Sequence, residues 1–284
     1  MKNCCNLRKY RKYFELFHYR GECILKIAIG GKGGTGKTTL TALLSLSFLN
    51  EGDRVIVVDA DPDANLASIL GYPHPDDIVP IVEMKSLIEE RTGARPGESG
   101  GYFKLNPRVD DIPDRFVVDH NGLKLLVMGR IREPAGGCMC PENVFLKELT
   151  AHLVLYRNEI LIMDMEAGIE HLGRGTAKNM DSFLVVVEPS GQSLESGKRI
   201  IELAKKLGIP DVQAILNKVA SEGDIDYIKR NLPDIPVAGI IPFSPAIRDA
   251  SRGELPIETV GEELAAVIAE IKKNLALASL VQSS

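Results

Sequence analysis

The sequence contains no tryptophan, and aromatic residues make up only 5% of its 284 positions. It also has no run of about 18 uncharged apolar residues, which is the length that a membrane-spanning helix requires. Its amino terminus lacks an apolar core followed by a small-residue cleavage site, as a secretory signal peptide would have. These absences argue against a helical membrane protein, and we expect a cytoplasmic protein with no membrane partner.

Cysteine is scarce as well, and its five copies do not suggest a disulfide framework. In a chain whose other features are cytosolic, cysteines are expected to be thiols or metal ligands. Two of them, Cys138 and Cys140, lie two residues apart. A strong positive charge is also missing, because the formal net charge is -5, which disfavours extensive binding to nucleic acid. We therefore expect no nucleic-acid partner.

Apolar runs rich in Val, Ile and Leu alternate with helical stretches along the chain. The runs are continuous rather than alternating with polar residues, which is typical of strands buried on both faces of a parallel sheet. They lie at 24–29, 54–59, 123–128, 159–164, 183–188, 212–216 and 237–241, and the helical stretches lie at about 36–51, 79–92, 141–157, 191–208, 223–231 and 262–279. This order predicts a doubly wound α/β fold with a mostly parallel sheet. We expect one domain over residues 24–284, with 93–122 as a long surface excursion.

The segment GKGGTGKT, from Gly31 to Thr38, fits the phosphate-loop pattern and lies between a predicted strand and a predicted helix. Backbone N–H groups of such a loop, with the positive end of a helix behind them, cradle the phosphates of ATP. Lys37 is expected on the β- and γ-phosphates, Thr38 on Mg²⁺ and Thr39 near the α-phosphate. The remaining residues of the expected cradle are Gly31, Lys32, Gly33, Gly34, Thr35 and Gly36.

A second lysine, Lys32, follows the first glycine of this loop. Its place resembles the deviant phosphate loop of the nitrogenase iron protein and the MinD/ParA group, whose extra lysine contacts nucleotide bound to a partner subunit. The resemblance implies that Lys32 is catalytic and that two chains form a homodimer around ATP. The alternative is a solvated lysine without a role.

Two further segments place carboxylates at the ends of predicted strands, where open α/β sheets bind ligands. The resemblance implies that Asp61, in DADPDANL, orients the attacking water, and that Asp164, in DMEAGIEHL, holds Mg²⁺ through water. It also implies that Gly168 donates its N–H to the γ-phosphate. We expect Asp59 and Asp63 only to cap turns.

The base of the nucleotide is expected near two later strand ends. Asn217, in ILNKV, has an amide that can both donate to and accept from an adenine edge, and the same resemblance favours it as base reader. The alternative is that Asn217 only caps the strand. Pro242, in IPFSPAI, is expected to close over the base.

The cysteine pair lies in GGCMCPENVFL, just before a predicted helix. Pro141 suits the first helical position, which would leave Cys140 at the helix amino terminus, where its pKa is expected to fall. Two thiolates cannot complete a four-coordinate site, but two copies of Cys138 and Cys140 can, and such a site suits Ni²⁺ or Zn²⁺. Without further context, inert or redox-active thiols would be the better interpretation.

The context is supplied by CMCPENVFL, MDMEAGIEHLGRGTA, VEPSGQS and LNKV, which occur in this order. Together they resemble the CooC-type nickel-insertion ATPases that mature carbon monoxide dehydrogenase, with relatives serving acetyl-CoA synthase. The resemblance covers about residues 24–260 and implies an ATP-dependent nickel chaperone. Two alternatives remain. One is a positioning ATPase of the MinD or ParA kind, and the other is an iron–sulfur electron-transfer ATPase.

Residues 1–23 precede the part that the resemblance covers. They carry six Lys or Arg against Glu15 and Glu22, a local charge of +4. We expect either a basic amphipathic helix or a start site assigned too far upstream.

Overall fold

A computed structural model describes residues 18–19, 22–61, 65–97, 102–129, 140–165 and 172–282; for 18–19, 22–23, 174 and 279–282 it describes only the backbone. The described residues form a two-stranded pair, β1 (His18–Tyr19) with β2 (Glu22–Cys23), and an eight-stranded sheet. The strands of the sheet are β3 (Lys26–Gly31), β4 (Val55–Ala60), β5 (Val118–His120), β6 (Leu123–Val127), β7 (Ile160–Met165), β8 (Ser182–Val187), β9 (Val212–Val219) and β10 (Val237–Pro242). Their spatial order is β10-β9-β8-β3-β7-β4-β6-β5.

The helices alternate with these strands, as the sequence predicts. They are α2 (Lys37–Asn50), α3 (Leu66–Ile69), α4 (Lys85–Thr92), α5 (Ile112–Phe116), α6 (Pro141–Tyr156), α7 (Arg174–Ala177), α8 (Gly191–Leu207), α9 (Glu222–Asn231), α10 (Pro245–Ser251), α11 (Ile257–Glu263) and α12 (Ala265–Gln282), with short 3-10 turns η3 (Pro75–Asp77) and η4 (Ile81–Glu83). Every pairing in the large sheet is parallel except that of β5 with β6. The predicted doubly wound, mostly parallel fold is confirmed.

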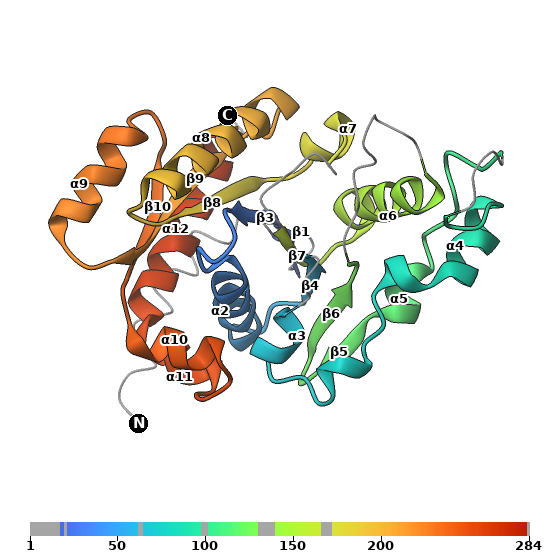
Figure 1. Cartoon of the computed structure of the whole chain (residues 1–284), viewed down its shortest axis with the longest axis horizontal. Coiled ribbons are helices and arrows are strands. Elements are labelled where there is room, and N and C mark those ends of the chain that lie inside the picture. The colour runs from blue at the N-terminus through green and yellow to red at the C-terminus, as the bar shows by residue number, and fades with distance from the viewer. Residues whose placement is uncertain are drawn as a thin grey trace.

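Helices cover both faces of the sheet, and the strand residues divide between two cores (Figure 1). In β3, Ala28 belongs to the core that α4, α6 and α8 cover, whereas Ile27 and Ile29 belong to the core under α2, α11 and α12. Neighbouring residues of a strand point to opposite faces, so a strand packed on both sides needs apolar residues at every position. This requirement explains the continuous apolar runs.

The structure corrects the prediction for residues 93–122. This stretch contains α5 and the edge strand β5, and its Val109 and Ile112 are buried in the core beside α4 and α6. Asn121 and Gly122, with φ of 54° and 88°, close a tight turn between β5 and β6. Despite its Gly-, Pro- and Asp-rich composition, this stretch forms the β5 strand of a β5–β6 hairpin that extends the sheet.

Two predicted helices are each divided in the structure. The stretch expected at about 79–92 is η4 followed by α4, and the stretch expected at 262–279 is preceded by α11 and interrupted at Leu264. The last helix, α12, is tied to α2 through Lys272, which is only 3% exposed. Its ammonium pairs with Glu51 at 2.7 Å and lies 4.1 Å from the ring centroid of Phe48.

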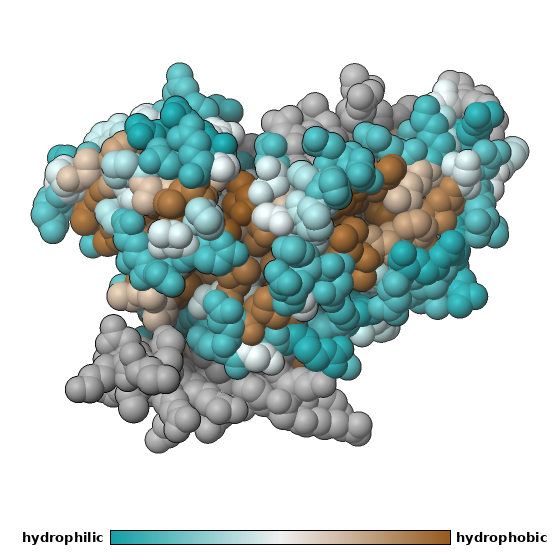
Figure 2. Space-filling view, turned by 90° about the horizontal axis from the view of Figure 1, so that it is seen from below, coloured by the Kyte–Doolittle hydropathy of each residue, from teal (hydrophilic) through white to brown (hydrophobic). Residues whose placement is uncertain are grey.

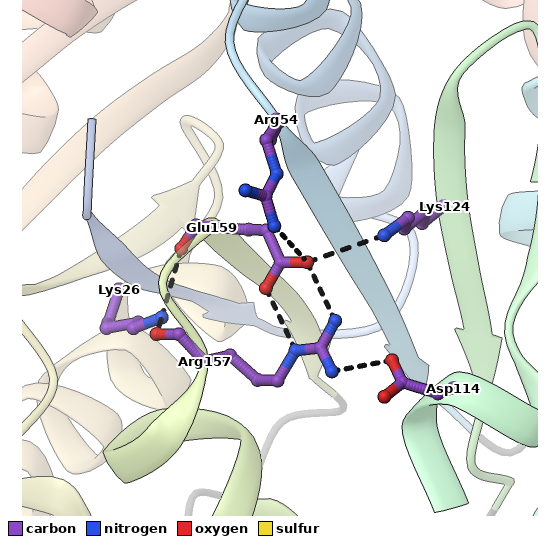
Figure 3. Close-up of polar contacts among 6 residues, drawn as sticks. All are labelled: Lys26, Arg54, Asp114, Lys124, Arg157 and Glu159. Atoms are coloured by element: carbon purple, nitrogen blue, oxygen red, sulfur yellow. Dashed lines mark hydrogen bonds and ion pairs between the residues drawn. The ribbon is translucent and has the colours of Figure 1, made fainter. Parts of the chain in front are cut away.

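A charged cluster lies at the amino-terminal end of the parallel strands (Figure 3). Its centre is Glu159, which is 1% exposed and directly precedes β7. Arg157 donates to it at 2.7 and 2.9 Å, and Arg54 and Lys124 lie 3.3 and 3.5 Å away. Arg157 also pairs with Asp114 at 2.7 Å. Burial alone would raise the pKa of Glu159, but Arg157 and its cationic neighbours outweigh it and lower that pKa to about 2.

The face of the molecule seen from below in Figure 2 is mostly polar. Figure 2 shows hydrophilic side chains spread over the face seen from below, with apolar side chains gathered between them in the middle of the molecule and toward its right. Within the described ranges, we find no helix with the length and hydrophobicity needed to span a membrane.

Candidate functional site

A cavity of about 650 Å³ opens at the carboxyl ends of the parallel strands. That volume is in the range of cofactor sites. The cavity brings together residues that sequence analysis selected from four separate segments: Gly33, Gly34, Gly36, Lys37, Thr38, Thr39, Asp61, Asn217 and Pro242. It is also lined by residues that sequence analysis did not select: Asn65, Ser68, Ile69, Lys218, Phe243, Ser244, Ile247, Arg248 and Ser251. These lie on α3, α10 and the strand ends beside them, so only the fold reveals them.

The floor of the cavity is the amino terminus of α2. Its N-cap is Gly36, with φ 96°, and this position makes no side-chain capping hydrogen bond. The first turn of α2 also contains no acidic residue. Because the first N–H groups of a helix have no partner within the helix, a cap without a side chain leaves them available to an anion.

Close packing requires glycine at two positions of this loop. A Cβ on Gly36 would lie 2.3 Å from Asn217 Nδ2, and one on Gly31 would lie 2.4 Å from the carbonyl oxygen of Val186. Gly33, by contrast, has open space around it. The glycines therefore serve both the loop conformation and its contact with the ends of β8 and β9.

Lys37, the first residue of α2, is buried, with 5% exposure. Its ammonium lies 3.9 Å from Asp61 Oδ2, just beyond the end of β4. Asp59, in contrast, accepts hydrogen bonds from the backbone N–H groups of Asp61 and Leu66, both at 3.1 Å. The prediction that Asp59 caps a turn is confirmed, and Asp63 lies outside the described residues.

Asp164 is fully buried in β7, directly opposite Asp59 of β4. Neither of its carboxylate oxygens makes a hydrogen bond of normal geometry with a described residue. Burial raises the pKa of Asp164 to about 7, against the smaller opposing influence of the nearby Thr38 hydroxyl. Burial likewise raises the pKa of Asp59 to about 6, although its two backbone donors oppose the shift. A buried carboxylate without donors is destabilising and uncommon in a folded protein, and it points to a ligand.

Asn217 and Lys218, near the end of β9, contact the phosphate loop. Asn217 donates from Nδ2 to the carbonyl oxygen of Thr35 at 2.6 Å and accepts from the N–H of Lys218 at 2.8 Å. Lys218 donates to the carbonyl oxygen of Gly34 at 2.7 Å and pairs with Glu188 at the same distance. The amide of Asn217 retains one hydrogen and one lone pair for a ligand.

Lys32 extends toward the amino terminus of α8, where its ammonium donates to Gln192 Oε1 at 2.5 Å. Thr35 ties the same turn together, because its hydroxyl donates to the carbonyl oxygen of Lys32 at 2.8 Å.

Cys140 is the N-cap of α6, and Pro141 is its first residue, as predicted. The predicted fall in the pKa of Cys140 is wrong. Burial raises that pKa, and the negative charge of Glu142 adds to the shift, while a hydrogen bond from the N–H of Asn143 opposes it. Cys138 and Gly168 lie outside the described residues. Within the described part of the chain, no group of three or more His, Cys, Asp and Glu side chains is placed to hold a metal ion.

Comparison with known families identifies this architecture. The sequence pattern of the CobQ/CobB/MinD/ParA nucleotide-binding domain matches residues 26–257. The chain belongs to this family. It is also 45% identical over 233 residues to the carbon monoxide dehydrogenase accessory protein CooC of Rhodospirillum rubrum, covering 81% of this chain and 88% of that protein. The predicted resemblance to the CooC type is thereby confirmed, and the chain is a P-loop ATPase that binds ATP.

Further relatives agree with this assignment. An uncharacterised ATP-binding protein of Methanocaldococcus jannaschii is 46% identical over 222 residues, which is 77% of this chain and 85% of that protein. Among solved structures, MinD of Pyrococcus horikoshii with Mg-ADP superimposes with a TM-score of 0.61 at 22% identity, covering 87% of this chain and 94% of that one. At such low identity the structural likeness shows the fold alone.

Proposed function

We propose that this CooC-type ATPase is a nickel chaperone that forms a homodimer around ATP and delivers Ni²⁺ to carbon monoxide dehydrogenase or acetyl-CoA synthase. The observation that carries this proposal is the 45% identity, over most of both chains, to an accessory protein of carbon monoxide dehydrogenase. The Cys-Met-Cys segment, with Cys140 at the amino terminus of α6, would supply the place for the metal.

The nucleotide would lie in the cavity, with its phosphates over the first turn of α2. The open N–H groups at Gly36 and the buried ammonium of Lys37 are suited to phosphate oxygens. Asn217 and Pro242 would border the base. Thr39 would contact the α-phosphate, and Gly168 the γ-phosphate.

Mg²⁺ fits the same site, because Asp164 has two buried oxygens without donors and the Thr38 hydroxyl is near. Thr38 and Asp164 would hold the ion, in part through water, together with the phosphates. The ion would neutralise charge on the phosphate oxygens. Asp61 would orient the attacking water, and Lys37 would stabilise the negative charge on the transferred phosphoryl group.

Lys32 would act in the partner's site. In the single chain the ammonium of Lys32 donates a hydrogen bond to Gln192 of α8. This bond is exposed, so the side chain can turn toward a partner chain at the cost of one weak hydrogen bond. In a dimer, Lys32 of each chain would meet the phosphates held by the other. This role would make hydrolysis depend on dimer formation.

The cargo metal would be bound by Cys138 and Cys140 of both chains, since one chain offers too few ligands for a four-coordinate site. The raised pKa of Cys140 means that this thiol is protonated before the metal arrives, so metal binding must release its proton. Zn²⁺ would compete for the same thiolates, because selectivity between the two metals rests on geometry and supply. Because ATP and metal would both stabilise the same dimer, each must raise the affinity for the other.

The test is anaerobic equilibrium dialysis of Ni²⁺ with and without a non-hydrolysable ATP analogue. We expect about one Ni²⁺ per dimer, tighter binding with the analogue, and no binding by Cys138→Ala/Cys140→Ala. Cys4→Ala/Cys5→Ala is the matched control and should bind as the wild type does. Unchanged binding in the first double variant would refute the metal site and favour a MinD-like positioning ATPase. A brown, iron-containing protein would instead favour the electron-transfer alternative.

A further inference from the structure

We propose that Asn217 and Lys218 form a clamp that sets the orientation of the phosphate loop, with Lys218 as a positioning residue for the ATPase reaction. The clamp consists of three side chains: Asn217, Lys218 and Glu188. Asn217 and Lys218 are separated by more than 180 residues in sequence from the loop peptides they hold.

The backbone of Lys218 is what allows two consecutive residues to reach the same loop. In a regular strand, neighbouring side chains point to opposite faces, so Asn217 and Lys218 would diverge. Lys218 instead has φ of 57°, and among the described residues only His74 and Asn121 are other non-glycine residues with positive φ. A left-handed lysine is disfavoured, and such strain is retained where the surrounding contacts require it.

The two contacts fix two successive peptide units of the loop. Asn217 holds the carbonyl oxygen of Thr35 at 2.6 Å, and Lys218 holds the carbonyl oxygen of Gly34 at 2.7 Å. Because a trans peptide is planar, its N–H points opposite to its carbonyl oxygen. Holding the Thr35 oxygen therefore directs the N–H of Gly36 away from Asn217. Holding the Gly34 oxygen keeps the N–H of Thr35 on the carbonyl of Lys32, at 3.2 Å, and so preserves the turn.

Glu188 completes the clamp by fixing the ammonium. It follows β8, and its carboxylate lies 2.7 Å from Lys218 Nζ. Its own N–H donates to the hydroxyl of Ser193, at 3.0 Å, in the first turn of α8. Lys218 is thus held between a loop carbonyl and an anchored carboxylate. Loss of the ammonium leaves Glu188 without its counter-charge and frees the Gly34 carbonyl.

The clamp predicts a particular kinetic pattern. A preorganised loop lowers the entropy lost in ordering N–H groups around phosphates, and this advantage applies to bound ADP and ATP as well as to the transition state. Removing the ammonium should therefore raise KM for ATP and Kd for ADP by about tenfold, the size of one charge-assisted hydrogen bond. The value of kcat should change less than about threefold.

The experiment compares Lys218→Gly, Lys218→Met and Lys218→Arg in the full chain, using steady-state ATP hydrolysis and ADP titration. Lys218→Gly relieves the positive φ while removing the ammonium, and Lys218→Met keeps the chain length. Both should show the rise in KM and Kd, whereas Lys218→Arg should recover most of the affinity. Glu188→Gln should give about a threefold rise, because it weakens only the ion pair.

Asn121→Gly is the matched control, since it removes the positive-φ side chain of the β5–β6 turn, which does not line the cavity. It should leave KM and Kd unchanged. The proposal is overturned if Lys218→Gly and Lys218→Met keep the wild-type KM, or if Lys218→Arg is as impaired as Lys218→Gly. A tenfold loss of kcat in these variants, without any change in KM or Kd, would also overturn the proposal. ATP hydrolysis and ADP binding are measured without nickel, so the result does not depend on whether the proposed metal delivery is correct.

Discussion

Two buried carboxylates, Glu159 and Asp164, lie five residues apart at opposite ends of β7, and their surroundings are opposite. Glu159 has Arg157, Arg54 and Lys124 around it and a pKa lowered to about 2. Asp164 has no described hydrogen-bond partner of normal geometry and a pKa raised to about 7. Both groups are at most 1% exposed, so burial alone does not distinguish them.

The difference shows how structural and functional charge can be told apart in one molecule. At the amino end of the sheet the cations needed by Glu159 come from the chain itself, so the cluster is complete and stabilises the fold. At the carboxyl end the chain compensates the charge of Asp164 only in part, because the Thr38 hydroxyl and the Lys37 ammonium are outweighed by burial. The buried carboxylate lowers the stability of the ligand-free protein, and a bound cation would offset its charge.

The largest effect should come from Asp164→Asn. This change keeps the shape of the side chain but removes the charge that we propose holds Mg²⁺, so ATP turnover should fall at least about 100-fold. The free energy of unfolding of the nucleotide-free protein should not fall, and above about pH 7 it should rise, because the change removes a carboxylate whose charge is disfavoured by burial. Steady-state hydrolysis and urea unfolding would measure both. Near-normal turnover in this variant would show that the charge of Asp164 is not needed for ATP hydrolysis.

The converse variant, Glu159→Gln, should damage stability and spare activity. It leaves Arg157 with Asp114 as its remaining anionic partner, and breaking a buried ion pair costs about 3 kcal/mol or less where, as here, some partners are partly exposed. Urea unfolding should show the loss, and ATP turnover of the folded variant should remain within about twofold of wild type. A selective loss of turnover would contradict a purely structural cluster.

The smallest effect should be a dependence of stability on pH in the nucleotide-free, Mg²⁺-free protein. The pKa values of Asp164 and Asp59 are about 7 and 6 when folded, above the ordinary value of 3.8. The folded state therefore keeps protons that the unfolded chain releases, and the free energy of unfolding should fall as pH rises from about 5 to 8.

The slope cannot exceed about 1.4 kcal/mol per pH unit for each proton retained. Glu159, with a folded pKa of about 2 against an ordinary value of 4.5, is ionised in both states above about pH 6 and adds no slope there. Chemical unfolding at several pH values should show a smaller slope in Asp164→Asn than in the wild type. Equal slopes would mean that Asp164 does not carry the retained proton.

Much of this site could be predicted because its signals are local. The phosphate loop needs glycines, a lysine and a threonine at fixed spacing between a strand and a helix, and all of these lie within Gly31 to Thr38. Asp61 and Asp164 could be selected because each follows or ends an apolar run. The alternation of apolar runs with helical stretches likewise predicts the parallel sheet.

The features that were missed depend on contacts between distant segments. The left-handed backbone of Lys218 and its contact with Gly34 leave no trace in the residues around either position. The pKa of Cys140 was predicted in the wrong direction because a helix terminus is visible in sequence, whereas burial beside Glu142 is not. The strand β6 is predicted, at 123–128, but its hairpin partner β5 was missed because it has only three residues and the turn between them resembles a loop.

The contact between α12 and α2 has a consequence for anyone who handles this protein. Lys272 joins the carboxyl-terminal helix to Glu51 and Phe48, at the far end of the helix that begins with Lys37. A chain truncated before Lys272 would lose both contacts at that end of α2. Affinity tags and fusions on the carboxyl side are therefore best added beyond an intact α12.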